Sequence, residues 1–374
     1  MPEVIVVGAG PVGLLMAAEL LRHGVDVELL EQRPHAGSGS RAIGIHAPVL
    51  AALEPSGLTA RLLTDAVRVS RGEARSDGKT LGSVRFDRLS ARFPYVATLP
   101  QAVTEEVLSH ASPEPVRGVE ATAIRPEAHG VQLRTDGEVR RAPLVVLAGG
   151  PRSRALVYSG PVVHDYVDRY LMIDAEVPDH HDSGTAVVHL DEMGVLESFP
   201  LPDARRRFVT WDTSCPSGDP QRPSAYMERA LRHRGERAQI SEAGQVTSFG
   251  VRRFVAPRMR NGRVFVIGDA AHEVSPIGGQ GMNLGLLDAV TLAPLLAGWI
   301  RSGSPPEKAL ARWERARVRS AGRAAGLAGM NTRLGRPAGP FLNLARRSGV
   351  RLMLGPGAGR LFAHAYAMGF DVDA

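Results

Sequence analysis

Residues 1–31 constrain the fold more strongly than any other part of the chain. Residues 4–7 form a short branched apolar run, the pattern of a strand buried on both faces, and the sequence Gly-Ala-Gly-Pro-Val-Gly follows at 8–13. The apolar segment 14–23 predicts a helix packed on a sheet, and 25–30 predicts a second strand that ends at Glu31. This order of strand, glycine turn, helix, strand and acid predicts a dinucleotide-binding unit of an α/β protein.

Each residue type in this unit has a physical reason. Gly8 permits a tight turn, Gly10 lets backbone amides approach a pyrophosphate, and Gly13 brings the helix close to the strand. The helix N-terminus supplies free N–H groups and a positive dipole, and Glu31 can accept hydrogen bonds from a ribose diol. The motif does not distinguish FAD from a nicotinamide dinucleotide, although its position at residue 8 favours FAD.

A second glycine-rich loop lies near the other end of the chain. Residues 263–267 predict a buried strand, Asp269 follows directly, and Pro-Ile-Gly-Gly-Gln-Gly-Met-Asn at 276–283 precedes an apolar helix. An aspartate past a strand end can accept hydrogen bonds from ribityl or ribose hydroxyls. Free amides before a helix suit the pyrimidine end of a flavin, which carries negative charge when reduced. The second loop therefore favours a flavin.

These motifs resemble those of a known family, the FAD-dependent class A aromatic hydroxylases of the para-hydroxybenzoate hydroxylase superfamily, and particularly the enzymes that tailor aromatic polyketides. The matching segments are VIVVGAGPVGLLMAAEL, LLEQRP, SRAIGIHAPVL, LPQAVTEEVL and GRVFVIGDAAHEVSPIGGQGMNLGLLDA, which are spread in order through the first 290 residues.

The resemblance implies a monooxygenase that hydroxylates an aromatic or polyketide-like small molecule through a C4a-hydroperoxyflavin, with FAD as cofactor and NADPH as its reductant. Because the cofactor performs the difficult chemistry, no metal site and no catalytic triad is expected. His46 and His272 are expected to make structural hydrogen bonds.

The matching motifs also imply which residues contact each part of FAD. Near the adenosine side, the resemblance implies that the pyrophosphate is contacted by Gly8, Gly10, Pro11 and Gly13, and the adenosine by Glu31, Gln32 and Arg33. Near the flavin, it implies that Arg41 contacts the ribityl and phosphate region, Asp269 the ribityl hydroxyls, and Gln101 the flavin. Pro276 is implied to lie against the ring face, and the pyrimidine edge to be lined by Gly279, Gly281, Met282 and Asn283.

The chain departs from the family pattern at Gly149. The family has an aspartate there, associated with flavin and NADPH binding, whereas this chain reads Gly-Gly-Pro-Arg-Ser-Arg at 149–154. In one interpretation a nicotinamide cofactor still reduces the flavin, helped by Arg152 and Arg154, whose cations suit phosphate. In the other, the protein keeps FAD without efficient NADPH reduction and acts as an oxidase or cyclase, or takes electrons from a separate flavin reductase.

We expect an α/β fold, with a Rossmann-like FAD-binding domain, an inserted antiparallel β-sheet substrate domain and C-terminal helices. The expected FAD-binding domain is discontinuous and covers 1–70, 97–160 and 255–300. The substrate domain covers 71–96 and 161–254, and the helical section covers 301–374. Strand-like pieces within 170–211 predict an antiparallel meander, but one sequence does not reveal which side chains point inward. His189, Trp211 and Tyr226 are candidates for substrate contact.

Composition excludes several other classes of protein. The net charge is +6, but the positive charge is scattered, and we expect no nucleic-acid partner. The single cysteine, Cys215, excludes an intrachain disulfide and any cysteine-rich zinc site. The apolar stretch 284–300 contains Asp288 and is too short for a membrane span, so we expect no stable membrane insertion. Without a signal-peptide pattern at the N-terminus, we expect a cytoplasmic protein.

Overall fold

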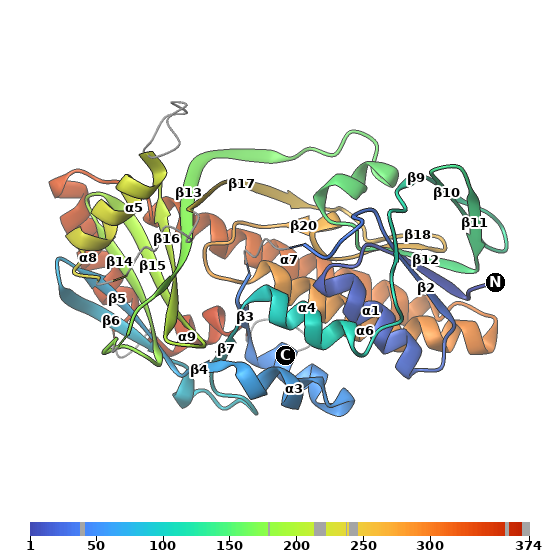
Figure 1. Ribbon diagram of the computed structural model, residues 1–374, viewed down its shortest axis with the longest axis horizontal. Helices are drawn as coiled ribbons and strands as arrows, with labels where there is room; N and C mark the ends of the chain where they lie inside the picture. The colour runs from blue at the N-terminus through green and yellow to red at the C-terminus, as the bar shows by residue number, and fades with distance from the viewer. Residues whose placement is uncertain are drawn as a thin grey trace.

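A six-stranded sheet forms one half of the structure, at the right of Figure 1. The computed structural model describes residues 1–37, 42–178, 180–212, 222–236, 238, 246–355 and 359–368. The strand order is β18-β19-β12-β1-β2-β8, and neighbours are parallel except for the terminal β18–β19 pair. All four residues of the central strand β1 are buried, as the apolar run predicted. The strands are β1 (Val4–Val7), β2 (Val27–Glu31), β8 (Val116–Arg117), β12 (Leu144–Leu147), β18 (Arg260–Asn261) and β19 (Val264–Val266).

Helices α1 (Pro11–Arg22) and α6 (Gly281–Ser302) pack against each other beside this sheet. Their approach is close, because a Cβ added to Gly285 would lie 2.5 Å from Cγ2 of Val12. By length and composition α6 is the described helix that could cross a membrane, but 67% of its most apolar window is buried inside the protein. The other helices are α2 (Ala47–Leu53), α3 (Leu58–Asp65), α4 (Gln101–Ser109), α5 (Arg222–His233), α7 (Glu307–Leu334), α8 (Pro340–Met353) and α9 (Gly359–Tyr366).

An eight-stranded sheet forms the other half, with the order β20-β17-β13-β16-β15-β14-β5-β6. Strands β14, β15 and β16 form an antiparallel meander as predicted, but β13 pairs with β16 and not with β14. The predicted meander of all four strands is therefore wrong at β13, because the pattern of a strand does not indicate its partner. The sequence did not indicate that β5, which lies much earlier in the chain, pairs with β14 in parallel and adds a hairpin to the sheet. The strands are β5 (Arg71–Ser76), β6 (Lys79–Arg85), β13 (His164–Glu176), β14 (Thr185–Asp191), β15 (Gly194–Leu201), β16 (Arg205–Trp211), β17 (Thr247–Val255) and β20 (His272–Glu273).

Two small sheets of three strands complete the described β structure, with the orders β3-β7-β4 and β11-β10-β9. The first lies near α3, and the second projects beyond the six-stranded sheet (Figure 1). Their strands are β3 (Gly44–Ile45), β4 (Val67–Val69), β7 (Val96–Thr98), β9 (Ala121–Pro126), β10 (Val131–Thr135) and β11 (Val139–Ala142).

The eight-stranded sheet separates two apolar clusters. On its outer face, Leu171 and Phe208 pack with Met227 of α5. On its inner face, Val209 and Phe249 belong to a cluster that includes residues of the α6 entry loop and of α8. Since α5 covers the outer face, the inner face is turned toward the six-stranded sheet and toward the cavity described below.

Candidate functional site

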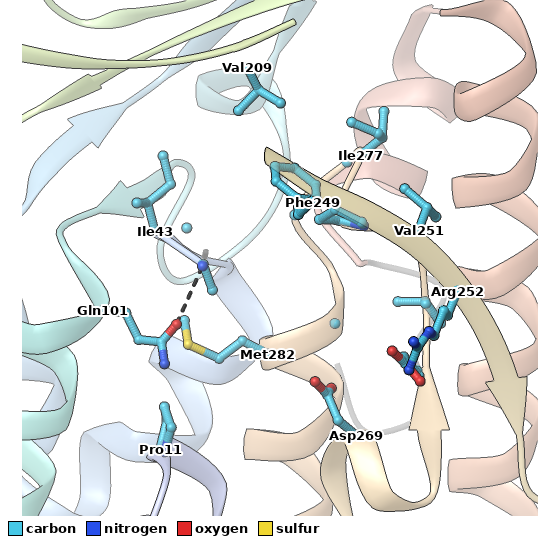
Figure 2. A pocket seen from close by; sticks show the side chains of 18 of the residues that line it. Pro11, Ile43, Gln101, Val209, Phe249, Val251, Arg252, Asp269, Ile277 and Met282 are labelled. Carbon is cyan, nitrogen blue, oxygen red and sulfur yellow. Dashed lines mark hydrogen bonds between the residues drawn. The ribbon is translucent and has the colours of Figure 1, made fainter. Parts of the chain in front are cut away.

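A cavity of about 1040 Å³ connects the two halves of the structure. One end is lined by the loops that follow β1, β2 and β12, and the other by the inner face of the eight-stranded sheet. The cavity changes from polar to apolar along its length: Figure 2 shows Pro11, Gln101 and Asp269 at the polar end and Val209 and Phe249 at the apolar end. The cavity therefore offers space for a long polar molecule and an apolar one in contact with it.

The first glycine loop fits the close approach of a phosphate group. Gly8 has φ +105°, and a Cβ there would lie 2.6 Å from the Ala148 carbonyl oxygen. A Cβ on Gly13 would overlap the carbonyl oxygen of Gly8, so both glycines are required by backbone packing. Gly10 differs, because it lines the cavity and a Cβ there would meet nothing within 4 Å. Its open surroundings and the adjacent start of α1 suit a pyrophosphate.

Glu31 lies at the end of β2 as an ionised, preorganised acceptor. Its Oε2 accepts a 2.8 Å hydrogen bond from the Ala9 amide, and its Oε1 accepts one of 2.9 Å from the Arg33 amide. Burial raises the pKa of this carboxyl, but the hydrogen bonds from Arg33 and Ala9 outweigh burial and hold the pKa below its ordinary value. Glu31, Gln32 and Arg33 all line the polar end, where a ribose diol requires an acceptor.

The second glycine loop lies across the cavity from the first. Asp269 lines the cavity from the turn that follows β19, and Pro276, Gly279, Gly281 and Met282 line it directly before or at the start of α6. Gln101 also lines it, and its Oε1 accepts a hydrogen bond of 3.4 Å from the Ala42 amide. The predicted residue Arg41 lies outside the described residues, as does Cys215.

Asn283 supports the second loop instead of lining the cavity. Its Nδ2 donates to the carbonyl oxygens of Gly44 at 2.8 Å and Gly279 at 3.0 Å, and its Oδ1 accepts from the His46 amide at 2.8 Å. Gly13 is likewise absent from the cavity lining among the described residues. These two predicted residues are therefore placed to shape the cavity wall from behind.

The two conspicuous histidines are both buried. Burial lowers the pKa of His46 to about 4, so its imidazole is neutral at pH 7. The Nε2 of His272 lies 2.5 Å from Oδ2 of Asp288, in the interior and away from the cavity lining. The structural role expected for His272 is confirmed by this contact.

Arg154 does not supply the free phosphate-binding cation that the sequence suggested. Its Nη2 donates to Oε2 of Glu273 at 2.6 Å and to the Asp269 carbonyl oxygen at 2.9 Å, and its guanidinium lies 4.3 Å from the centroid of the Phe254 ring. Arg154 is buried and engaged, so it holds the Asp269 loop in place. Arg152 remains on the cavity lining with an exposed side chain.

The apolar end was only partly visible in the sequence. His189, Trp211 and Tyr226 are not among the described residues that line the cavity. His189 bonds Glu236 on the outer face, with Nε2 and Oε1 separated by 3.0 Å. The inner face instead presents Met172, Val188, Val195, Glu197, Phe199, Val209 and Phe249. Strand alternation groups 195, 197 and 199 on one face, but does not indicate that this face is the inner one.

One group of possible metal ligands lies elsewhere, within the residues described. His180, His181 and Asp182 place ligand atoms within 4.8 Å of one another. His180 Nε2 already contacts Glu236, and both carboxylate oxygens of Asp182 accept from Arg75. Their existing partners account for this cluster, which we interpret as part of the outer polar network.

Comparison with known proteins agrees with the flavin features of the site. The family described as "FAD binding domain" matches residues 1–326. The chain is 31% identical over 341 residues to 6-methylpretetramide 4-monooxygenase of Streptomyces rimosus, covering 86% of this chain and 60% of that protein. It is 32% identical over 321 residues to a rifampicin monooxygenase of Streptomyces venezuelae, covering 80% of this chain and 66% of that protein.

Solved structures show the same fold over nearly the whole chain. The p-nitrophenol 4-monooxygenase of Pseudomonas putida superposes with a TM-score of 0.87 at 22% identity, covering 98% of each chain. The anhydrotetracycline hydroxylase of Streptomyces rimosus superposes with a TM-score of 0.77 at 26% identity, covering 98% of this chain and 75% of that one.

The chain spans only 60% to 66% of the length of the two curated relatives above. The family match extends from the first glycine loop through the second and into α7. The two glycine loops, Glu31 and the long cavity agree with this match. The chain therefore belongs to the FAD binding domain family, and its cofactor is FAD.

Proposed function

We propose that this protein is an FAD-dependent monooxygenase that hydroxylates an aromatic or polyketide-like small molecule. The observation that carries the proposal is the continuous cavity that runs from the glycine loop and Glu31 to the apolar face of the eight-stranded sheet. A cofactor at one end and an apolar substrate at the other would then meet within the same cavity. The names of the curated relatives support this class of reaction.

The polar end would hold FAD through groups that the structure already preorganises. We assign the pyrophosphate to the loop at Gly10 and Pro11, and the adenosine ribose to Glu31 with Gln32 and Arg33 beside it. Asp269 would accept from ribityl hydroxyls, while Gln101, Pro276 and Met282 would surround the ring. Gly8, Gly13 and Asn283 set the shape of these loops, and Gly279 and Gly281 leave backbone amides accessible at the start of α6.

FAD, when bound, supplies the redox chemistry and the activation of O₂. The protein positions the ring, excludes water and orients the substrate. The 22-residue helix α6 directs its N-terminal end at the second loop, where the positive end of its dipole stabilises negative charge by about 0.3–2 kcal/mol. The apolar inner face keeps water away from the reacting centre.

We further propose that residues 71–96 and 161–254 contribute the substrate-binding half, that the three segments 1–70, 97–160 and 255–300 hold FAD, and that 301–374 packs as a helical section. Under this proposal the protein works in the cytoplasm, and its partner is a small molecule. Electrons would come from NADPH, with a separate flavin reductase as the alternative source. The oxidase or cyclase alternative depends on Gly149 alone, and the relatives do not favour it.

Anaerobic reduction tests the proposed function directly. Purified protein loaded with FAD is mixed with excess NADPH, with and without a panel of polycyclic phenols. The absorbance band of the oxidised flavin at about 450 nm is followed. We expect the band to bleach, and to bleach faster with a substrate. Addition of O₂ should then give a product that is heavier by one oxygen atom. A band that stays yellow with NADPH but bleaches with dithionite would contradict direct NADPH reduction.

A further inference from the structure

Glu197 lies in the middle of the apolar face that lines the cavity. On β15 it is directly opposite Val188 of β14 and Val209 of β16, and Val209 is in turn opposite Met172 of β13. Residues directly opposite each other in an antiparallel sheet share a face, and all four line the cavity. Figure 2 shows Val209 beside the apolar end of the cavity, so Glu197 places a carboxyl group among aliphatic side chains there.

The carboxyl group of Glu197 has no hydrogen-bond or ion-pair partner among the residues that the structure describes, although the residue is only 5% exposed. Two other acids of the same sheet, the half-buried Asp174 and the buried Asp191, are paired with cations. Asp174 contacts Arg207 at 2.6 Å, and Asp191 contacts Arg234 at 2.8 Å. Burial raises the pKa of Glu197 to about 8, so the group is mainly a neutral carboxylic acid at pH 7.

Tyr170 of β13 and Tyr366 of α9 are the titratable groups that interact electrostatically with Glu197. Burial raises the pKa of both phenols, so neither is charged near pH 7. The hydroxyl of Tyr366 already donates to Oδ1 of Asn331 at 2.7 Å. Neither tyrosine therefore supplies a cation that would stabilise an ionised Glu197.

Burial at this position removes much of the carboxyl group's contact with water, and no protein group replaces it, so the unpaired carboxyl destabilises the folded protein. Leucine or glutamine would fill the same space with less penalty, so packing alone does not favour glutamate. A ligand hydroxyl that enters the cavity would supply the missing partner. Both forms of the carboxyl accept a hydrogen bond from such a group, and the neutral form also donates one.

We propose that Glu197 binds a hydroxyl group of the substrate and thereby selects phenols and hydroxylated polycycles over analogues without that group. The inference rests on the proposed function for the aromatic nature of the occupant. The flat ring system would lie along the row of Met172, Val188 and Val209, with its hydroxyl at Glu197. Fixing one hydroxyl fixes the orientation of the whole ring system and so determines which carbon is presented to the cofactor end.

A binding experiment on oxidised, FAD-loaded protein tests this assignment without reduction or oxygen. The probes are three matched pairs with one, two and three rings, each pair consisting of a phenol and its methyl ether, and the readouts are flavin absorbance perturbation and titration calorimetry. For at least one pair, we expect the phenol to bind wild type about 10-fold or more tightly than the ether. Glu197→Leu should abolish that preference, and Glu197→Gln, which still accepts a hydrogen bond, should restore part of it.

Glu176→Gln serves as a matched control, because Glu176 lies on the same sheet with an exposed side chain. FAD content verifies that each variant has folded. Equal binding of phenol and ether to wild type across all pairs, or no binding of any phenol, would overturn the assignment, as would an unchanged preference in Glu197→Leu. If phenols bind through Glu197 but none is hydroxylated, the proposed function fails alone. If hydroxylation persists in Glu197→Leu with unchanged KM, this inference fails alone.

Discussion

Asp288 Oδ2 lies 2.5 Å from Nε2 of His272, and this contact ties helix α6 to the strand that follows the Asp269 loop. The same carboxylate accepts a 3.0 Å hydrogen bond from the Gly268 amide and one of 2.8 Å from Nε of Arg317 on α7. Burial would raise the pKa of Asp288, but His272 and Arg317 hold the pKa below its ordinary value. A single buried carboxylate therefore connects α6, α7 and the second glycine loop.

Asp288→Asn should destabilise the protein strongly. Asp288 and Arg317 are each 0% exposed, so the variant leaves a buried guanidinium without its counter-charge. Removal of one partner from such a pair costs about 3–5 kcal/mol, measurable as a loss in the free energy of unfolding in urea. Glu307→Gln is the control, because Glu307 pairs with Arg260 at 2.6 Å but is 62% exposed, and we expect little change. Equal effects of the two substitutions would contradict the central role of Asp288.

The glycines of the first loop should separate folding from cofactor binding. Gly13→Ala should prevent correct folding, because its Cβ would overlap the Gly8 carbonyl oxygen. Gly10→Ala should fold, since its Cβ meets nothing within 4 Å and its φ of −79° is open to alanine. If the pyrophosphate lies against Gly10, the added methyl group should weaken FAD binding by about 10-fold or more. Far-UV circular dichroism and FAD titration measure the two effects.

Gly298→Ala in α6 is the matched control for these glycine variants. Its Cβ also meets nothing within 4 Å, but it lies far along the helix from the cavity. We expect unchanged FAD affinity and a gain in stability of about 0.5–1 kcal/mol, because alanine favours a helix interior. Wild-type FAD affinity in Gly10→Ala would show that the pyrophosphate lies elsewhere.

The polar end of the cavity could be predicted because its determinants are local. Gly8, Gly13 and Glu31 belong to one βαβ unit, in which the glycine spacing and the strand end fix their relative positions. Asp269 was singled out for the same reason, since it follows a strand end, whereas Pro276 was assigned by its place in the matching family motif. Both residues line the cavity. Asn283 shows the limit of this reasoning, because its amide bonds Gly44, which lies far away in the sequence.

The substrate half depends on pairings that no local pattern contains. The alternation in β15 puts Glu197 on one face of a strand, but only α5 on the opposite face establishes that this face lines the cavity. His189 is adjacent to Val188 in β14 and therefore points to the outer face, where Glu236 meets it. From the sequence, Arg154 was a candidate for binding phosphate. In the structure it pairs with Glu273, which lies more than a hundred residues later in the chain, so no local pattern indicates this contact.

Glu197→Gln should stabilise the protein relative to wild type by a margin that grows with pH. The pKa of the Glu197 carboxyl is 4.5 in the unfolded chain and about 8 in the folded one, where burial raises it. Between these values the unfolded state binds fewer protons, so wild-type stability falls by about 1.4 kcal/mol per pH unit, whereas the amide does not titrate. Below pH 4.5 the difference should be constant. Thermal unfolding of both proteins from pH 4 to 9 measures it, and a difference that does not change with pH would contradict the raised pKa.

Gly149→Asp should require a second change before it can affect reduction. A Cβ on residue 149 would lie 2.9 Å from Cβ of Ser153 and 3.0 Å from its Oγ. The single variant should therefore disturb the loop and lose FAD. Ser153→Gly removes both atoms, so the double variant should keep FAD. NADPH should also reduce the flavin of the double variant several-fold faster in anaerobic stopped flow. The reason is that the hydroxylases that this chain resembles carry an aspartate at this position, and that aspartate is associated with NADPH binding.

Ser153→Gly alone is the control for this comparison, because it removes the hydrogen bond of 2.8 Å from Ser153 Oγ to the Gly150 carbonyl oxygen without adding a carboxylate. Its reduction rate should match that of wild type. If the double variant keeps FAD but is reduced no faster than this control, then the glycine at 149 does not limit reduction. The oxidase or cyclase alternative would then lose the one observation on which it depends, because Gly149 would reflect the packing of Ser153 against the loop.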